Sequence, residues 1–298
     1  MFDTTHPEVR AAVERALAED IGSGDITSQL TIPENLQARG KFLARQPLVL
    51  AGIELLPLIY EFRGGAEVEL LSRSGASVQT GDILAKVSGK ARTLLECERV
   101  ALNFLQRLSG IATLARQYVD AVAGRTRVLD TRKTTPGLRQ LEKMAAAAGG
   151  VANHRIGLFD AILIKNNHIT AAGGVRNALE RTKHFAGPVE IEVRTRAELD
   201  EALAAGAKYL LLDNLSPAEA AEWVRRVAGR AITELSGRIT LENIRAYAEA
   251  APDFISCGAI THSAAAVDIS FRLELDDPRP LPAGRGSEPR PAGRGICS

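Results

Sequence analysis

The sequence predicts an α/β protein whose C-terminal part is built on a parallel sheet. After Gly124, six short apolar runs alternate with stretches of helical periodicity, the pattern of strand–helix units. Polar residues stand at the carboxyl end of each run, where the loops of α/β enzymes form their sites. Six units are fewer than the eight of a full barrel, so an incomplete or irregular α/β barrel and an open doubly wound sheet both fit.

The composition is that of a soluble globular protein. The chain has 298 residues, of which 45% are hydrophobic and 24% charged, and its net charge is +1. We therefore expect no nucleic acid and no membrane as partner. Cys97, Cys257 and Cys297 lie far apart and the first residues lack an apolar signal segment. These features predict a cytoplasmic protein without a disulfide or zinc framework.

The first hundred residues predict a mixture of helices and short strands. A helix is expected over residues 7–20 and ends before Gly22, and residues 75–87 are typical of a β-turn-β element. Apolar residues between 97 and 112 recur at spacings of three and four, which predicts one long amphipathic helix. Within it, the pair Ser109-Gly110 is expected to bend the helix or divide it in two.

The C-terminal part predicts six strands followed by a tail. The strands are expected at residues 127–130, 161–165, 189–193, 209–213, 232–236 and 254–258. Beyond residue 275 the chain is rich in proline, glycine and arginine and repeats the sequence AGRG. Such a segment cannot bury a core, so residues 276–298 are predicted to be a disordered tail.

Polar and charged residues lie at the carboxyl ends of the predicted strands. In order they bear Asp130-Thr131-Arg132-Lys133, Lys165, Glu190-x-Glu192, Asp213-Asn214, Glu234-x-Ser236-Gly237 and Ser256-x-Gly258. Along residues 189–193 the apolar side chains share one face, so Glu190 and Glu192 are expected to point into the barrel. Buried carboxylates need partners, and Lys133 and Lys165 are the natural ones. A structural ion-pair network explains any single residue here, but the whole series favours a site.

The predicted pocket has three parts. Its positive charge comes from Arg132, Lys133, His154, Arg155 and Lys165, which suit an anionic substrate. Glu192 and Asp213 suit a hydrated divalent cation or ribose hydroxyls. The loops after Gly237 and Gly258 suit a phosphate, through backbone N–H groups and helix N-termini. For His168 a structural role is at least as well supported as catalysis.

A set of motifs in this order resembles the quinolinate phosphoribosyltransferase family. The motifs are Glu19-Asp-Ile-Gly-Ser-Gly-Asp25-Ile-Thr27, Glu98-Arg99, Leu108-Ser-Gly-Ile-Ala-Thr113, Asp130-Thr-Arg-Lys-Thr-Thr-Pro-Gly-Leu-Arg139, Asn153-His-Arg155, Ile164-Lys165-x-Asn-His168, Glu190-Ile-Glu192-Val, Leu212-Asp213-Asn214, Glu234-x-Ser-Gly237 and Ser256-x-Gly-Ala-x-Thr261-His262. They extend over about residues 10–275. One departure concerns Arg238, which stands where the family usually has the second glycine of Ser-Gly-Gly.

The resemblance implies a fold, a reaction and a cofactor. The fold is an N-terminal α/β sandwich domain, residues 1–112, joined to an incomplete α/β barrel of six or seven strands, residues 113–265. Residues 266–275 are expected to return to the N-terminal domain. The family reaction joins quinolinate to phosphoribosyl pyrophosphate with Mg²⁺ and gives nicotinate mononucleotide, pyrophosphate and carbon dioxide.

The resemblance also implies a role for each site residue. The quinolinate pocket would contain Thr131, Arg132, His154, Arg155 and Lys165, with Arg99 contributed by the second subunit of a homodimer. The phosphoribosyl pyrophosphate side would contain Lys133, Glu192 and Asp213, the last two holding Mg²⁺ through water. The 5′-phosphate would be held by Ser236, Gly237, Gly258 and His262.

Two other functions stay open on the residues alone. A barrel aldolase would use Lys133 or Lys165 as a Schiff base, but it leaves the carboxylates and the phosphate loops without a task. A repurposed pyrophosphorylase-like paralogue would keep the fold without the reaction. The intact runs 130–133 and 153–155 argue against that second alternative.

Overall fold

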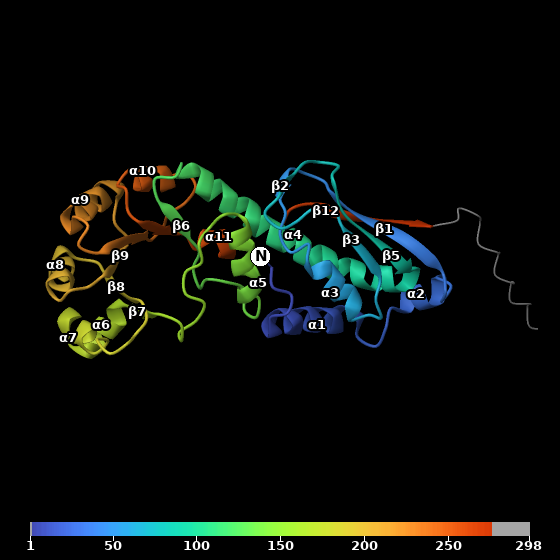
Figure 1. The fold of residues 1–298 in the computed structure, drawn as a ribbon, viewed down its shortest axis with the longest axis horizontal. Helices are drawn as coiled ribbons and strands as arrows, with labels where there is room; N and C mark the ends of the chain where they lie inside the picture. The colour runs from blue at the N-terminus through green and yellow to red at the C-terminus, as the bar shows by residue number, and fades with distance from the viewer. Residues whose placement is uncertain (1, 276–298) are drawn as a thin grey trace, which may run out of the picture.

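The structure is a computed structural model that describes residues 2–275, so the predicted tail at 276–298 lies outside the described residues. Figure 1 shows two parts side by side: an N-terminal sheet with its helices, and a C-terminal array of strands with helices around it. Within residues 2–275, no helix combines the length and the apolar character needed to cross a membrane.

The N-terminal part is a four-stranded antiparallel sheet covered by helices. The sheet has the order β12-β1-β5-β3, formed by Gln37–Ala44 (β1), Glu67–Leu70 (β3), Ile83–Lys90 (β5) and Ile269–Leu275 (β12). Its helices are Pro7–Ile21 (α1), Ile26–Thr31 (α2) and Leu55–Glu61 (α3), and the predicted first helix is thereby confirmed. Two short strands, Leu48–Val49 (β2) and Ser77–Val78 (β4), pair with each other.

Two strands of this part pair differently from the sequence expectation. Residues 75–87 do contain β4, a turn and β5, but the two strands do not form a hairpin. Instead β4 pairs with β2, whereas β5 pairs with β1 and β3. The predicted β-turn-β element is therefore present, but its two strands pair with other strands and not with each other as a hairpin.

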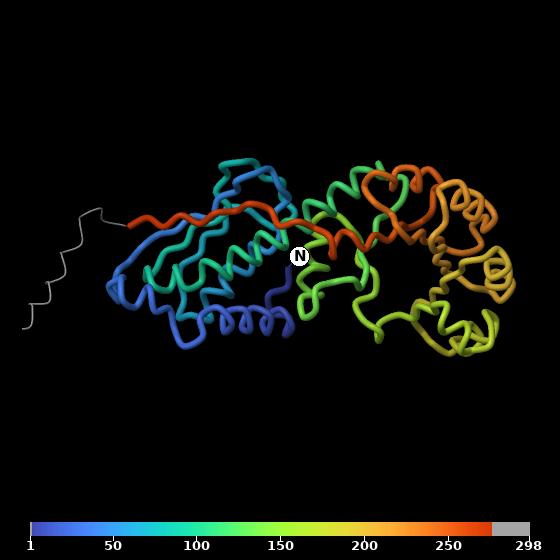
Figure 2. Tube along the Cα trace, turned by 180° about the vertical axis from the view of Figure 1, so that it is seen from behind, coloured from blue at the N-terminus to red at the C-terminus, as the bar shows by residue number. Residues whose placement is uncertain are grey.

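The last described strand joins the chain's two ends. Strand β12 pairs antiparallel with β1, with Ile269 opposite Ala44 and Leu275 opposite Ala38. Figure 2 shows this segment, at the red end of the colour range, running back along the N-terminal half after the C-terminal strands are complete. The N-terminal sheet is thus completed only when residues 269–275 have returned to it.

A single long helix connects the two parts. Helix α4 (Ala91–Ala121) is continuous, so the expected division at Ser109-Gly110 is wrong. Ser109 Oγ donates to the carbonyl oxygen of Ala51, and the backbone of Ala265 passes directly over Gly110. The small pair therefore serves close packing of the returning chain and leaves the helix unbroken.

The C-terminal part is a six-stranded parallel sheet that forms an incomplete barrel. Its order is β6-β11-β10-β9-β8-β7. The strands are Arg127–Leu129 (β6), Ile162–Ile164 (β7), Val189–Val193 (β8), Tyr209–Asp213 (β9), Ile232–Ser236 (β10) and Phe254–Ser256 (β11). All six predicted strands are confirmed. A parallel bridge between Leu129 and Ala152 adds a further backbone segment beside β6.

Helices connect these strands in sequence. They are Arg139–Ala148 (α5), Asn166–Ala172 (α6), Val175–Glu180 (α7), Arg196–Ala204 (α8), Pro217–Val227 (α9), Ile244–Ala248 (α10) and Ala259–His262 (α11). Ile191 and Val193 of β8 are fully buried, whereas Glu190 and Glu192 alternate with them and are 5% and 4% exposed. The two glutamates thus lie on the opposite face of the strand, as the alternation predicted.

Candidate active site

The carboxyl ends of the parallel strands bring the predicted site residues to one edge of the sheet. Thr131 to Lys133 follow β6, Lys165 follows β7 and Glu192 lies in β8. Asp213 ends β9 opposite Ser236, which ends β10. Because the strands are parallel, these side chains gather although the residues span more than a hundred positions.

The first and last of these loops are in contact. A side chain at Gly258 would come within 2.9 Å of Lys133 Cδ and 3.2 Å of His262 Nε2, so a larger residue there would displace these two side chains. Gly237 has a φ of 99°, and a side chain on it would come within 2.5 Å of Asn214 Oδ1. Both glycines therefore permit a close approach of backbone and side chains that a larger residue would block.

Two arginines in this region have buried donors without a partner. The Nε atoms of Arg132 and Arg155 are buried and make no hydrogen bond. Arg155 is fixed through its Nη1, which donates to the carbonyl oxygen of Ala161 at 2.9 Å. A buried guanidinium N–H without an acceptor is costly, which makes these two donors candidates for binding an anion.

His154 lies against two buried glutamates from neighbouring parts of the barrel. Its Nε2 is 3.2 Å from Glu190 Oε2 and 3.6 Å from Glu234 Oε2. The pKa of each glutamate is raised to about 7, mainly by burial and, for Glu234, also by the charge of Glu190. Burial also lowers the pKa of His154. Two carboxylates this close cannot both ionise freely, so protonation is shared within the cluster.

The backbone determines which tautomer His154 adopts. The N–H of Arg155 donates to Nδ1 at 2.8 Å, so the ring proton resides on Nε2 and points at Glu190. The ligand atoms of His154, Glu190 and Glu234 lie within 4.8 Å of one another, a spacing that a metal ion tolerates. An Nε2 that carries the proton has no lone pair for a metal, so this cluster is better described as a proton-bearing one.

The loop with His154 is tied to the end of β6 by a buried carboxylate. Asp130 is fully buried and pairs with Lys143 of α5. It also accepts from Asn153 Nδ2 at 2.7 Å and from the backbone N–H of His154 at 2.8 Å. Lys143 in turn donates to the carbonyl oxygen of His154 at 2.8 Å. The runs 130–133 and 153–155 are thereby held beside each other.

A second group of charges lies at the ends of β8 and β9. Arg194 Nη2 is 2.7 Å from Glu192 Oε1, and Arg194 Nε is 3.8 Å from Asp213 Oδ2. Lys165 Nζ is 3.8 Å from Glu192 Oε2, as expected, whereas Lys133 forms no ion pair with any described residue. The expectation that Lys133 neutralises a barrel glutamate is therefore not met, because Arg194 and His154 are nearer.

These carboxylates fit a hydrated divalent cation. Glu192 Oε1 is buried, and Arg194 Nη2 lies 2.7 Å from it as an ion-pair partner without the geometry of a hydrogen bond. Carboxylate oxygens are the ligands that Mg²⁺ prefers. The side chain of Arg194 is 48% exposed, whereas that of Glu192 is 5% exposed. That Glu192 and Asp213 together bind such a cation stays a prediction.

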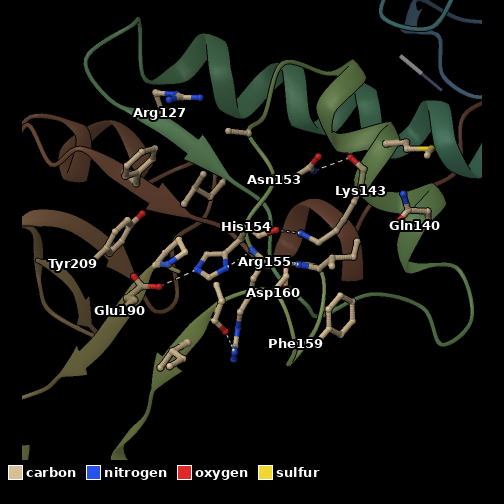
Figure 3. A pocket seen from close by; sticks show the side chains of 18 of the residues that line it. Arg127, Gln140, Lys143, Asn153, His154, Arg155, Phe159, Asp160, Glu190 and Tyr209 are labelled. Atoms are coloured by element: carbon tan, nitrogen blue, oxygen red, sulfur yellow. Dashed lines mark hydrogen bonds and ion pairs between the residues drawn. The ribbon is translucent and has the colours of Figure 1, made fainter. Parts of the chain in front are cut away.

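A cavity lies on the other side of the His154 cluster. It has a volume of about 830 Å³ and is lined by His154, Arg155 and Glu190 at one end. Figure 3 shows Arg127 and Tyr209 across the cavity from Lys143 and Phe159. Arg127 and Tyr209 begin their strands, so this cavity extends toward the amino ends. The mouth residues Arg132, Lys133, Lys165, Glu192 and Asp213 do not line it.

Arg99 and His168 lie apart from this arrangement, whereas His262 lies beside Gly258. Arg99 is exposed on α4, and no described interaction joins it to the barrel residues of its own chain. His262 ends α11, and its Nδ1 is 2.6 Å from Ser263 Oγ. His168 Nδ1 accepts from the backbone N–H of Lys165 at 2.9 Å and so caps α6, a structural role.

Sequence reasoning missed several residues of this region. Arg194 directly follows β8, and that position after a strand was the available signal. Glu234 was recognised only as part of the strand-end series. Lys143 gave no signal, because a lysine within a helix is usually solvated. Its burial, at 2% exposure, depends on contacts between distant segments.

Comparisons with known proteins agree on one family. Residues 25–109 and 111–272 match the models for the N-terminal and C-terminal domains of quinolinate phosphoribosyl transferase. The chain is 40% identical to the carboxylating nicotinate-nucleotide pyrophosphorylase of Arabidopsis thaliana, covering 91% of this chain and 85% of that protein. It is 37% identical to a probable enzyme of the same name from Bacillus subtilis, covering 91% and 96%.

Solved structures resemble the chain over nearly its whole length. The structure of NadC from Streptococcus pyogenes superposes with a TM-score of 0.88 at 37% identity, covering 93% of this chain and 99% of that one. The nicotinate-nucleotide pyrophosphorylase from Francisella tularensis superposes with a TM-score of 0.86 at 36% identity. Both parts of the fold are therefore shared with these relatives in the same relation to each other.

Proposed function

The chain belongs to the quinolinate phosphoribosyltransferase family, and from that premise we propose how its residues divide the reaction between them. The family activity transfers phosphoribosyl from phosphoribosyl pyrophosphate to quinolinate, with loss of carbon dioxide, in the biosynthesis of NAD. The observation that carries the assignment of subsites is that Arg132 and Arg155 each have a buried guanidinium N–H without a partner.

The quinolinate subsite is proposed around these two arginines. Quinolinate carries two carboxylates on a flat ring, and arginine forks bind carboxylates with defined orientation. Thr131 and Lys165 flank the arginines in the neighbouring loops and would add a hydroxyl and a second kind of cation. His154 would offer its Nε2 proton to the substrate in exchange for Glu190.

The phosphoribosyl pyrophosphate subsite is proposed on the opposite side of the run 130–133. Lys133 has no ion pair among the described residues and lies beside Gly258, so its charge is available for a phosphate. Glu192 and Asp213 would hold Mg²⁺, which when bound neutralises the leaving pyrophosphate. Ser236, Gly237, Gly258 and His262 would bind the 5′-phosphate.

The chain's residues contribute mainly by position and charge. As pyrophosphate leaves, the ribosyl carbon gains oxocarbenium character, which the carboxylates of Glu192 and Asp213 stabilise electrostatically. The pyridine nitrogen, held in line by the arginines, then forms the bond to that carbon. When the carbon–carboxylate bond breaks, carbon dioxide leaves and the electron pair stays on the ring carbon, where the adjacent positive ring nitrogen stabilises it. The ring carbon afterwards takes up a proton.

A homodimer completes the proposed site. Arg99 is exposed on α4 and joins no site residue of its own chain among residues 2–275. An exposed arginine beside the N-terminal sheet is suitably placed to reach a second subunit. A cytoplasmic location is the corresponding proposal for the whole enzyme, although the Arabidopsis relative is named as chloroplastic.

The test is a turnover assay with purified protein, Mg²⁺ and phosphoribosyl pyrophosphate. We expect release of pyrophosphate and carbon dioxide with quinolinate, and none with nicotinate, which lacks the carboxylate that is lost. A folded protein that gives no quinolinate-dependent pyrophosphate would contradict the assignment. Borohydride trapping in the same assay should give no adduct on Lys133 or Lys165, since the aldolase alternative finds no support in the family.

A further inference from the structure

A fully buried glutamate on α5 binds both the loop that carries Lys133 and an arginine of helix α4. Glu142 is 0% exposed. Its Oε1 accepts from Thr135 Oγ1 at 2.7 Å, and its Oε2 accepts from the backbone N–H of Thr135 at 3.0 Å. Thr135 belongs to the loop that carries Lys133. A buried charge requires such partners, so the loop and the glutamate fix each other.

The same glutamate binds an arginine from the connecting helix. Arg107 of α4 donates Nη2 to Glu142 Oε1 at 2.9 Å and Nε at 3.2 Å. Arg107 also donates Nη1 to the carbonyl oxygen of Ala264 at 2.7 Å and Nη2 to that of Thr261 at 2.6 Å. One guanidinium thus joins α4, α5 and the segment that contains α11.

The connection closes on Lys133. Thr261 Oγ1 donates to the carbonyl oxygen of Lys133 at 2.8 Å. The hydrogen bonds therefore form a ring that passes from the Lys133 loop through Thr135, Glu142, Arg107 and Thr261, and back to Lys133. Residues 130–138 contain no helix and no strand, so the position of Lys133 depends on side-chain bonds of this kind.

The neighbouring residue on α5 faces the other half of the site. Lys143 binds Asp130 and the carbonyl oxygen of His154, which belong to the proposed quinolinate side. Glu142 binds the loop of Lys133 and, through Arg107, the end of α11 with His262. Two adjacent buried charges of opposite sign therefore support two different subsites.

We propose that Arg107, Glu142 and Thr261 are positioning residues for the phosphoribosyl pyrophosphate subsite. They hold Lys133 and the loop of Gly258 in a fixed position relative to each other. The proposal rests on the proposed function for the identity of the substrate. It assigns no contact with substrate to these three residues. Their loss should therefore weaken binding of the phosphoribosyl donor and leave quinolinate binding largely unchanged.

Two conservative substitutions test this with matched controls. Thr261→Val removes the hydroxyl at nearly constant volume, and Thr261→Ser restores it. Arg107→Lys keeps the charge but loses the fork that reaches three acceptors at once. Arg226→Lys makes the same change in an exposed pair with Asp200 on an outer helix, where we expect no effect on kinetics. Circular dichroism and thermal melting establish that each variant is folded.

The first readout is steady-state kinetics with each substrate varied in turn. We expect Thr261→Val to raise the KM for phosphoribosyl pyrophosphate by about fivefold, the effect of one ordinary hydrogen bond. For Arg107→Lys we expect the KM for phosphoribosyl pyrophosphate to rise by about ten- to hundredfold, the range typical of residues that orient a ligand-binding side chain without touching the ligand. The KM for quinolinate should stay within about twofold in both, and Thr261→Ser should behave as wild type. Equal increases for both substrates, or none, would overturn the proposal.

The second readout does not need activity. Hydrogen exchange of the backbone amides in residues 131–137 should accelerate in Thr261→Val and Arg107→Lys, and stay unchanged in Thr261→Ser and Arg226→Lys. Unchanged exchange in the first two variants would overturn the positioning role. If wild-type protein gave no turnover, the proposed function would fail, and the exchange data would still decide whether these residues hold the loop.

Discussion

Arg155 illustrates how a single residue is prepared for an anion. Its guanidinium is anchored at one end by Ala161, while its Nε is buried without an acceptor. The anchoring fixes the orientation before the substrate arrives, which reduces the entropy lost on binding. In the proposed quinolinate subsite, a carboxylate of the substrate would supply the missing acceptor.

Replacing this residue tests the quinolinate subsite directly. Arg155→Lys keeps the charge but loses the planar fork and the anchor on Ala161. We expect kcat/KM for quinolinate to fall by about 10- to 150-fold, the range for a lost charge-assisted hydrogen bond. The KM for phosphoribosyl pyrophosphate should change little. Steady-state kinetics with each substrate varied in turn measures both parameters. A fall in kcat/KM for phosphoribosyl pyrophosphate alone, with quinolinate unaffected, would contradict the assignment.

Glu234 makes stability depend on pH. Burial, and the charge of Glu190, raise its pKa from an ordinary value near 4.5 to about 7 in the folded protein. Between these values the folded state holds a proton that the unfolded state has released, so stability falls as pH rises through this window and levels off above it. We therefore expect wild-type protein to melt at a lower temperature at pH 8 than at pH 5 on account of this group.

The matching substitution is Glu234→Gln, which keeps the shape and removes the titration. We expect its melting temperature to fall less between pH 5 and pH 8 than that of wild type. Glu222→Gln, which changes an exposed ion pair on α9, serves as the control and should follow the wild-type profile. Parallel profiles for Glu234→Gln and wild type would show that Glu234 is ionised in the folded state across the whole range.

At the scale of elements, α4 is the part that joins the two halves of the molecule. Its first half packs against the N-terminal sheet, and its second half packs against α5 and β6. The returning chain crosses it at Gly110, where the backbone of Ala265 leaves no room for a side chain. Val267 N–H then donates to the carbonyl oxygen of Gln106, and Gln106 Nε2 donates to that of Ile269.

Gly110→Ala tests this crossing. Alanine normally stabilises a helix relative to glycine, so helix propensity alone predicts a more stable protein. The collision with the Ala265 carbonyl should outweigh that gain and destabilise the fold by about 1–3 kcal/mol, the usual cost of overpacking. Chemical denaturation measures the change. An increase in stability would show that residues 264–268 can move away from α4 without cost.

At the scale of the whole molecule, the position of Arg99 relates the fold to assembly. The residue is exposed on the N-terminal half of α4, and Arg107 on the same helix supports the site of its own chain. If Arg99 completes the site of a second subunit, α4 carries one arginine for each of two sites. The dimer would then be required for activity and not only for stability.

Subunit mixing tests this arrangement. Arg99→Ala and Lys165→Ala should each be nearly inactive alone, because every site lacks one residue. A mixed dimer has one barrel with both residues intact, so random exchange should recover about one quarter of the wild-type activity. Native mass spectrometry of subunits that carry tags of different mass provides the control for exchange. No recovery from the two variants, with exchange demonstrated, would place Arg99 outside the partner's site.

Much of this molecule follows from local patterns in the sequence. The alternation of apolar and polar residues located all six strands of the barrel and showed which face of β8 carries Glu190 and Glu192. Parallel strands present their carboxyl ends at one edge of a sheet. The polar residues that follow the strands can therefore be grouped into one site from their positions along the chain. The order of the motifs then indicates the family.

The choice of partners was decided only by the tertiary structure. The sequence assigned Lys133 and Lys165 to the barrel glutamates, whereas His154 and Arg194 lie closer to them. It carried no sign that Glu142 and Arg107, 35 positions apart, would meet. Periodicity reports the local geometry of a helix or strand. Which charged side chains become buried together depends on how distant segments pack, and that is determined by the fold as a whole.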